Sequence, residues 1–233
     1  MTAPIAFICA MPMELKPLSK RLGLRKTSIH GMQVHSGSLD GRDVIAIVTG
    51  MGTALATAGT ERLLDAVSPE RVVVVGITGA VENDTPIGTL VLPEVVVNSE
   101  TGDEHRPTPL GAGIPHGVMW TTNALTPPGA LPALRAKGVV SLDMETAAIA
   151  KCCEARDIPW SVVRAISDRA SDGTVGDEVF QMSNQDGTPN VGRVVRYVVR
   201  HPHHLPRLAK MGQQVKLATE RAADAAIAAV STT

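Results

Sequence analysis

The stretch "VVRAISD", residues 162–168, sets the fold expected for this chain. A short run of β-branched residues is typical of a strand buried on both faces, and this run ends on a serine and an aspartate. Open α/β sheets place their chemistry at the carboxyl ends of strands, so Asp168 is either a helix cap or a working acid. Arg164 lies inside the run and requires a carboxylate partner, for which Glu14 and Glu145 are the candidates.

Further strand-like runs and helical patterns surround this stretch. The strand-like runs cover residues 5–11, 43–50, 71–79 and 88–97, and helical periodicity covers residues 52–67, 141–157 and the chain after residue 190. Strands that alternate with helices favour a mostly parallel sheet covered by helices on both faces, and a hairpin turned at "LDGRD" makes that sheet mixed. The sequence therefore predicts an α/β fold of three layers, αβα, around a central mixed, mostly parallel sheet. We expect a single domain over residues 1–233, with a C-terminal helical tail over residues 191–233.

Composition narrows the class of protein. The 233 residues are 44% hydrophobic and 19% charged, which suits one domain with a single core. Lys and Arg number 22 against 23 Asp and Glu, so no overall field favours nucleic acid or an anionic membrane. No apolar run approaches the roughly 20 residues that span a bilayer, and the first residues lack the pattern of a signal peptide. We therefore expect a cytoplasmic protein whose partner is a small molecule.

The metal-binding residue types are poorly placed for a metal site. Two of the three cysteines, Cys152 and Cys153, are adjacent, which argues against a disulfide framework or a spaced ligand set. His201, His203 and His204 lie in a proline-broken segment, and a solvated connector explains them better than a metal site does. We expect neither a metal nor another cofactor.

Two segments after predicted strands contain candidate site residues. Glu14, in "CAMPMELKPL", comes where the first helix begins, so it either stabilises the helix end or acts as a general base. In "TGMGTALAT", residues 49–57, the glycines suit close packing of helix on strand better than a phosphate cradle, because no lysine follows them. Met51 in this turn is a candidate ligand contact.

Two further segments leave their alternatives open. In "VVVVGITGAV", Gly76 and Gly79 end a central strand whose backbone approaches either a ligand or a neighbouring helix. In "LDMETAAIA", Asp143 and Glu145 are either ordinary acids of a first helical turn or holders of a ribose diol. Met144 between them is either core filler or part of the same site.

Together these segments resemble the nucleoside phosphorylase and nucleosidase superfamily, most closely its 5'-methylthioadenosine/S-adenosylhomocysteine nucleosidase type. The resemblance covers roughly residues 5–180 and is most specific in "VVSLDMETAAIA" followed by "PWSVVRAISD". It implies that Met144 and Glu145 hold the sugar, with Glu145 on the 2' and 3' hydroxyls. It also implies that Asp168 protonates N7 of the purine and that Ser167 orients Asp168.

The same resemblance implies how water and the rest of the substrate are bound. It assigns Glu14 to activation of the attacking water and Arg164 to positioning of that water and its neighbouring carboxylates. Met11, Met51 and the loop over residues 98–117 would line the 5' side of the substrate. Ile77, which replaces a serine found in the nucleosidases and so changes the surroundings of the water, and Gly79 are further candidates for substrate binding. Breaking an N-glycosidic bond builds positive charge on the sugar and negative charge on the base, which such groups stabilise.

Some positions depart from the family pattern, and they bear on which nucleophile reacts and on which substrate is bound. Phosphorylases of the superfamily grip phosphate with arginines and a serine loop, but here Val74 and Ile77 stand at those positions, which favours water as the nucleophile. Leu125 replaces an aromatic residue that stacks on adenine, so the base and the 5' group stay open. The alternatives are a phosphate-dependent phosphorylase, a relative acting on futalosine or adenosylhopane, and a nucleoside-binding protein without catalysis.

Oligomeric state follows from the resemblance alone, which implies a homo-oligomer, with a dimer favoured. The apolar stretch "AADAAIAAV", residues 222–230, is either a contact between copies or a helix folded back on its own sheet.

Overall fold

The computed structural model describes residues 3–169 and 204–232. Its helices are α1 (Pro12–Arg21), α2 (Thr53–Ala66), α3 (Leu131–Ala136), α4 (Thr146–Glu154) and α7 (Leu205–Ser231), and a short 3-10 helix covers Pro128–Ala130. The strands are β1 (Ile5–Cys9), β2 (Arg25–Ile29), β3 (Met32–Leu39), β4 (Arg42–Val48), β5 (Arg71–Ala80), β6 (Leu90–Val91), β7 (Val95–Asn98), β8 (Glu104–His105), β9 (Val118–Thr121), β10 (Val139–Asp143) and β11 (Trp160–Arg169).

One mixed sheet joins these strands in the order β2-β3-β4-β1-β5-β10-β9-β7-β8, and β11 pairs with β5 and β6. The pairs β1–β4, β1–β5, β5–β11, β7–β9 and β9–β10 are parallel, whereas β2–β3, β3–β4, β5–β10, β6–β11 and β7–β8 are antiparallel. The predicted hairpin is present as β3 and β4, with Asp40 and Gly41 at its turn. The mixed sheet predicted from the sequence is confirmed.

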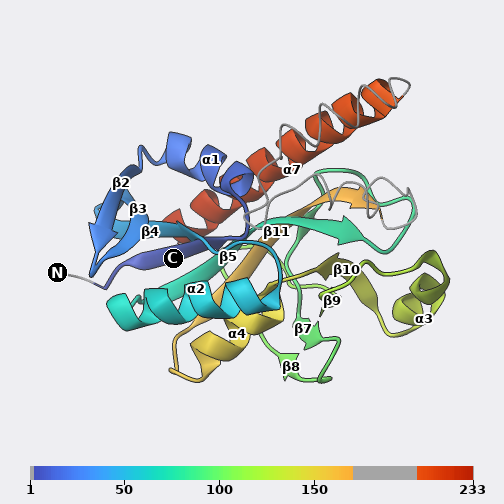
Figure 1. Ribbon diagram of the computed structural model, residues 1–233, viewed down its shortest axis with the longest axis horizontal. Coiled ribbons are helices and arrows are strands. Elements are labelled where there is room, and N and C mark those ends of the chain that lie inside the picture. The colour runs from blue at the N-terminus through green and yellow to red at the C-terminus, as the bar shows by residue number, and fades with distance from the viewer. Residues whose placement is uncertain (1–2, 170–203, 233) are drawn as a thin grey trace.

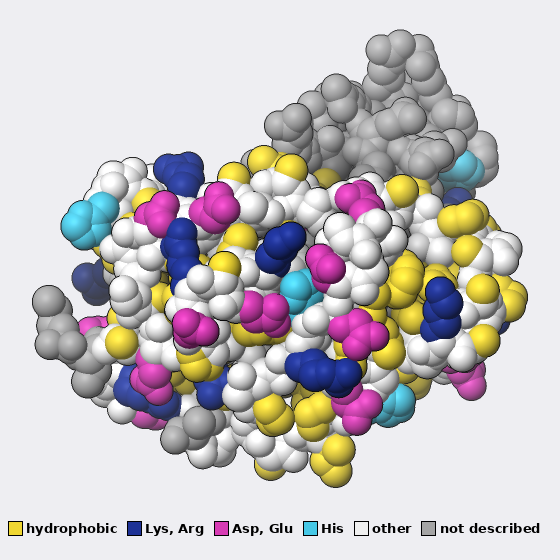
Figure 2. Space-filling model, turned by 90° about the horizontal axis from the view of Figure 1, so that it is seen from below, with side chains coloured by type: hydrophobic (Ala, Val, Ile, Leu, Met, Phe, Trp, Pro, Cys, Tyr) yellow, Lys and Arg dark blue, Asp and Glu magenta, His cyan; other side chains and the backbone are white. Residues whose placement is uncertain are grey.

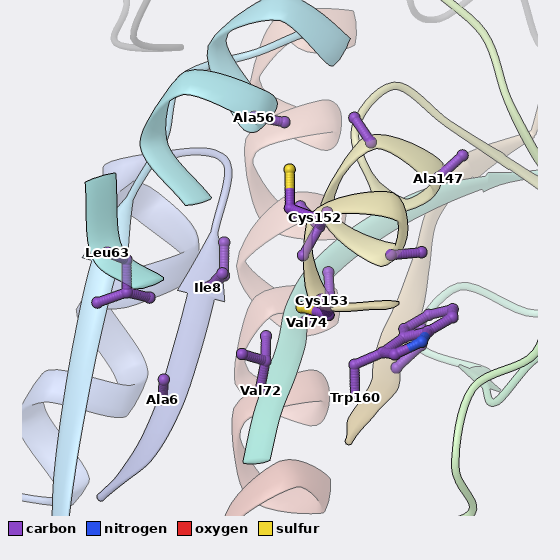
Figure 3. Packing of buried hydrophobic residues seen from close by; sticks show 14 of the residues in the cluster. Ala6, Ile8, Ala56, Leu63, Val72, Val74, Ala147, Cys152, Cys153 and Trp160 are labelled. Atoms are coloured by element: carbon purple, nitrogen blue, oxygen red, sulfur yellow. The ribbon is translucent and has the colours of Figure 1, made fainter. Parts of the chain in front are cut away.

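Helices cover both faces of the sheet, as Figure 1 shows. On one face, α2 and α4 pack against the strands through a core that includes Leu63, Cys152 and Trp160 (Figure 3). On the other face, α1 and α7 enclose a second core, in which Phe7 and Leu18 are fully buried. The three-layer αβα arrangement is therefore confirmed.

The helix α7 shows which alternative holds for the apolar C-terminal stretch. Ala222, Ala223, Ala226 and Val230 are buried in the second core, against the chain's own sheet. This part of α7 thus folds back on the domain. Residues 191–203 of the predicted tail lie outside the described part of the chain, as do His201 and His203.

Two predicted elements begin or break elsewhere than expected. The strand predicted over residues 88–97 is two strands, β6 and β7, because Pro93 between them has no N–H for a strand ladder. The helix predicted to begin at Ser141 begins instead at Thr146, and residues 139–143 form β10. Asp143 therefore ends a strand.

Charged side chains of both signs are interspersed on the face seen in Figure 2. This agrees with the balanced composition. Among the described residues, no helix combines the length and apolarity that crossing a membrane requires.

Candidate active site

The predicted site residues converge where β1 and β4 end beside the middle of β5. Glu14 lies in the first turn of α1, directly after β1, and Met51 lies in the turn from β4 to α2. The strand β10 runs antiparallel to β5 with Leu142 opposite Gly79, so its carboxyl end returns to the same place. Four stretches that are far apart in the sequence thereby meet at the carboxyl ends of β1 and β4.

Glu14 is buried and held by three backbone N–H groups. Its Oε2 accepts hydrogen bonds from the N–H groups of Ala10 (2.8 Å) and Met11 (2.9 Å), and its Oε1 accepts one from Ile77 (2.8 Å). Burial raises the pKa of Glu14 above its ordinary value, although Arg164 and the three N–H donors oppose the shift. Glu14 is therefore both a first-turn acid of α1 and a carboxylate with raised proton affinity.

Gly76 explains how a carboxylate fits against the central strand. A Cβ at this position would lie 2.7 Å from Cδ of Glu14 and 3.1 Å from Nη1 of Arg164. Real Cβ atoms essentially never approach another heavy atom as closely as the Glu14 carboxyl lies here, and the approach to Arg164 would also be tight, so this position requires glycine. The close approach that the sequence left open at Gly76 is thus an approach to the Glu14 side chain.

Arg164 is the buried centre of a carboxylate cluster. Its Nη2 lies 2.8 Å from Oδ2 of Asp143 and 3.3 Å from Oε2 of Glu145, whereas its Nη1 lies 3.9 Å from Oε1 of Glu14. The guanidinium is only 2% exposed, and Nη1 also donates a 2.7 Å hydrogen bond to the carbonyl of Ile77. The prediction that Arg164 pairs with Glu14 or Glu145 is confirmed for Glu145, but its nearest partner, Asp143, was not among the candidates.

Glu145 is fixed from two sides. Its Oε1 accepts a 2.9 Å hydrogen bond from the N–H of Gly52, at the start of α2, and its Oε2 contacts Arg164. Burial raises the pKa of Glu145 to about 7; Arg164 and the Gly52 N–H oppose this shift, and the Asp143 charge adds to it. A carboxyl held in this way retains lone pairs that can accept hydrogen bonds from sugar hydroxyls.

Asp168 lies near the end of β11, at an irregularity in the strand. The pairing with β5 shifts between Ile166 and Asp168, so Ser167 is the extra residue of a β-bulge. The hydroxyl of Ser167 donates a 2.6 Å hydrogen bond to Oδ1 of Asp168. A Cβ on Gly79 of the neighbouring strand would lie 3.3 Å from Oδ2 of Asp168, so glycine leaves space beside this carboxyl.

Four of the predicted ligand contacts have partly exposed apolar side chains. The side chains of Met11, Met51, Ile77 and Met144 are partly exposed, in contrast to the fully buried Val74 of the same region. That these four side chains contact a ligand stays a prediction. Leu125, at the position of the missing aromatic residue, is 38% exposed.

Only the beginning of the loop over residues 98–117 lies near the site, where Glu100 accepts a hydrogen bond from Asn123 beside the start of α2. Thr108 is hydrogen-bonded to Trp160, at the opposite end of β11 from Asp168, and Gly111 lies against Ala229 of α7. The middle of this loop therefore packs at the amino end of β11. The prediction that the whole loop lines the site is wrong, because hydrogen bonding and packing hold the middle of the loop at the end of β11 opposite Asp168.

Asn123 is a polar group of this region that sequence reasoning missed. Its Oδ1 accepts hydrogen bonds of 3.0 Å from both the N–H and the hydroxyl of Thr53, in the first turn of α2, and its Nδ2 donates to Glu100. These contacts hold the start of α2, next to the Gly52 N–H that binds Glu145. The motif "TTNAL" contains this asparagine, but only the fold shows that it faces α2.

Comparison with known proteins agrees with this architecture. The family model described as the phosphorylase superfamily matches residues 4–127 and 110–200. A 5'-methylthioadenosine/S-adenosylhomocysteine nucleosidase of Chromohalobacter salexigens is 28% identical over 228 residues, covering 84% of this chain and 96% of that protein.

Solved structures share the fold. The nucleosidase of the same name from Neisseria meningitidis, in complex with methylthio-immucillin-A, matches with a TM-score of 0.74 at 16% identity and covers 99% of both chains. The futalosine hydrolase of Helicobacter pylori matches with a TM-score of 0.73 at 15% identity, covering 99% of this chain and 98% of that one. Because the family model matches well over half of the sequence, and the fold agrees, this chain belongs to the phosphorylase superfamily.

Proposed function

We propose that this protein is an N-ribosyl hydrolase. It cleaves the N-glycosidic bond of a purine nucleoside with a modified 5' group, such as methylthioadenosine or S-adenosylhomocysteine. The observation that carries this proposal is the buried Glu14 carboxylate, whose proton affinity is raised at the point where β1, β5 and β11 meet. A base in such a place can activate water at neutral pH.

The reaction divides among the residues as follows. Glu14 takes a proton from a water molecule, whose oxygen forms a bond to the anomeric carbon of the ribose. The bond from that carbon to the purine nitrogen breaks, its electron pair passes into the base, and Asp168 donates a proton to N7. Ser167 orients Asp168 through the 2.6 Å hydrogen bond. Glu145 accepts hydrogen bonds from the 2' and 3' hydroxyls, which fixes the sugar while it gains positive charge.

Water is favoured over phosphate by the charges of the site. Arg164 already faces three carboxylates and the Ile77 carbonyl, so it offers no uncompensated positive charge to an anion. Ile77 and Val74 stand where the phosphorylases of the superfamily have phosphate-binding groups. A phosphate dianion beside these carboxylates and aliphatic side chains would cost several kcal/mol.

Hydrolysis of futalosine is a second candidate for this site. The exposed Leu125, 38% accessible, provides no aromatic platform for adenine. A futalosine hydrolase is among the structures that share the fold over nearly the whole chain. The base and the 5' group are therefore the features that an assay must identify.

We extend the proposal to the cellular location, oligomeric state and metabolic role of the protein. The Chromohalobacter salexigens relative carries the name of an enzyme for methylthioadenosine and S-adenosylhomocysteine. We place this protein in the cytoplasm, as a single domain that forms a homodimer, with a role in methionine salvage. It needs neither a metal nor a cofactor, because a base, an acid and a sugar-binding carboxylate suffice for the chemistry.

Release of free base tests the proposal directly. Methylthioadenosine, S-adenosylhomocysteine, inosine, adenosine and futalosine are incubated with the protein, with and without phosphate. We expect phosphate-independent release from one of them, with loss of activity in Glu14→Gln and Asp168→Asn. The matched control Glu70→Gln makes the same change at an exposed glutamate and should retain activity.

The other outcomes separate the alternatives. Release that requires phosphate would identify a phosphorylase. Tight nucleoside binding without cleavage would identify a binding protein. Full activity of both Glu14→Gln and Asp168→Asn on the identified substrate would refute the mechanism.

A further inference from the structure

Asp143, at the carboxyl end of β10, is buried and surrounded by donors. Its Oδ1 accepts a 2.6 Å hydrogen bond from the hydroxyl of Thr121. Its Oδ2 accepts from the N–H groups of Glu145 (3.2 Å) and Thr146 (2.8 Å), from the Thr146 hydroxyl, and from Nη2 of Arg164 at 2.8 Å. Five donors on two oxygens suit an ionised carboxylate, which only accepts hydrogen bonds.

These contacts also fix the direction in which the Arg164 guanidinium points. Nη2 is directed at Asp143, Nε donates a 3.2 Å hydrogen bond to the hydroxyl of Thr146, and Nη1 donates to the Ile77 carbonyl. Glu14 stays at 3.9 Å from Nη1, beyond hydrogen-bond distance. The charge of Arg164 is thus directed mainly at Asp143.

We propose that Asp143 is a positioning residue of this hydrolase: it holds the Arg164 guanidinium away from Glu14, and so leaves Glu14 able to take a proton from water. This role rests on the function proposed above. Asp143 also holds the first N–H groups of α4, and therefore the backbone that carries Glu145. Asp143, which does not itself react, thereby positions two groups: the Glu14 base, through Arg164, and the sugar-binding Glu145.

The titratable and charged groups that interact with Glu14 are Cys9 of β1, Glu145 directly before α4 and Arg164 of β11. Asp143 of β10 acts on Glu14 through its contact with Arg164. Burial raises the pKa of the Cys9 thiol well above its ordinary value, so the thiol stays neutral around neutral pH. Arg164 is therefore the only cation of this group, and its orientation decides how strongly Glu14 binds a proton.

Asp143→Asn removes the nearest negative charge while it keeps the size of the side chain. The guanidinium then turns toward the two remaining carboxylates. Shortening the contact with Glu14 from 3.9 Å to about 2.8 Å would lower the pKa of Glu14 by about one unit, from Coulomb's law at an effective dielectric constant of about 20. The Glu145 carboxyl shifts in the same direction, because it loses a repulsive neighbour.

The pH profile of kcat/KM on the nucleoside that the wild-type protein cleaves is the test. We expect the acidic limb of Asp143→Asn to lie about one pH unit below that of the wild type, and kcat/KM at the plateau to fall by up to about tenfold because the base is weaker. Asp143→Glu restores the negative charge and should bring the limb back toward the wild-type pH. Thr78→Val is the structural control, since it removes a buried hydroxyl that donates to the Leu142 carbonyl without changing any charge.

An acidic limb of Asp143→Asn within about 0.3 pH units of the wild type would overturn the proposal, as would an equal shift in Thr78→Val. If Asp143→Asn does not fold, ¹³C NMR titration of the Glu14 carboxyl in the wild-type protein decides instead. Titration of Glu14 at or below the ordinary range of glutamate would mean that Arg164 pairs with Glu14, against the proposal. A wild-type protein that cleaves no nucleoside would refute the proposed hydrolysis, whereas this NMR titration separately tests the orientation of Arg164.

Discussion

Replacing Gly76 by alanine adds one methyl group at the most crowded point of the site. The new Cβ would lie 2.7 Å from Cδ of Glu14 and 3.1 Å from Nη1 of Arg164. Carbon atoms in contact are separated by about 3.5–4.0 Å, so the Glu14 carboxyl must move by about 1 Å. That movement breaks the 2.8 Å hydrogen bond from the Ile77 N–H and weakens those from Ala10 and Met11.

The displacement predicts losses of both activity and stability. A misplacement of about 1 Å at a reacting group costs about 100-fold in rate, so we expect kcat/KM to fall by about that factor. A buried N–H left without its acceptor costs about 1–3 kcal/mol, and we expect the free energy of unfolding to fall by a similar amount. Steady-state assay of base release and urea unfolding measure the two effects.

A matched glycine and a double variant make the test specific. Gly212→Ala adds the same methyl group to an exposed position of α7 with no atom within 4 Å, so it should leave activity unchanged and raise stability by up to about 1 kcal/mol. In a Glu14→Gln background the base is already lost, so Gly76→Ala should reduce activity little further. Gly76→Ala activity within about threefold of the wild type, or a full additional loss in the double variant, would refute the reasoning.

Three further perturbations test other parts of the site. In Glu14→Gln an amide NH₂ replaces one of the two accepting oxygens, so at least one of the three backbone N–H donors loses its acceptor. We therefore expect urea unfolding to show a loss of about 1–3 kcal/mol besides the loss of activity; unchanged stability would contradict this donor arrangement. The pKa of Glu145, raised from 4.5 to about 7, means that the folded state binds this proton more tightly than the unfolded state. The Glu145 contribution to stability is therefore present below about pH 4.5 and is lost as the pH rises to about 7, at up to about 1.4 kcal/mol per pH unit. Urea unfolding at pH 5 and 7.5 should show this fall in the wild type and a smaller one in Glu145→Gln; equal falls would contradict it. Gly79→Ala crowds Oδ2 of Asp168 at 3.3 Å, so kcat should fall by about three- to tenfold with KM little changed, and a change in KM alone would place the crowding elsewhere.

Local sequence was sufficient to locate several elements and the candidates for catalysis. The run "VVRAISD" predicted a buried strand with Arg164 inside it, and the strand is present as β11. A buried guanidinium requires carboxylates wherever it lies, so the search for acidic partners followed from the residue alone. The loop over residues 98–117 was misplaced, since glycine and proline content indicates a loop but does not determine the end of the sheet to which it is fastened.

The sequence by itself determined the alternating pattern of strands and helices, and the residue types from which a base, an acid and a sugar-binding carboxylate can be drawn. The periodicity of apolar residues and the chemical type of each residue are local properties, so they can be determined from the sequence without the fold. Only the tertiary structure decided that Asp143, at the end of a strand, is the nearest partner of Arg164, and that Gly76 makes room for Glu14. Both depend on distances between segments far apart in the chain, which are set by the register of β5 against β10 and β11 and by packing across the sheet.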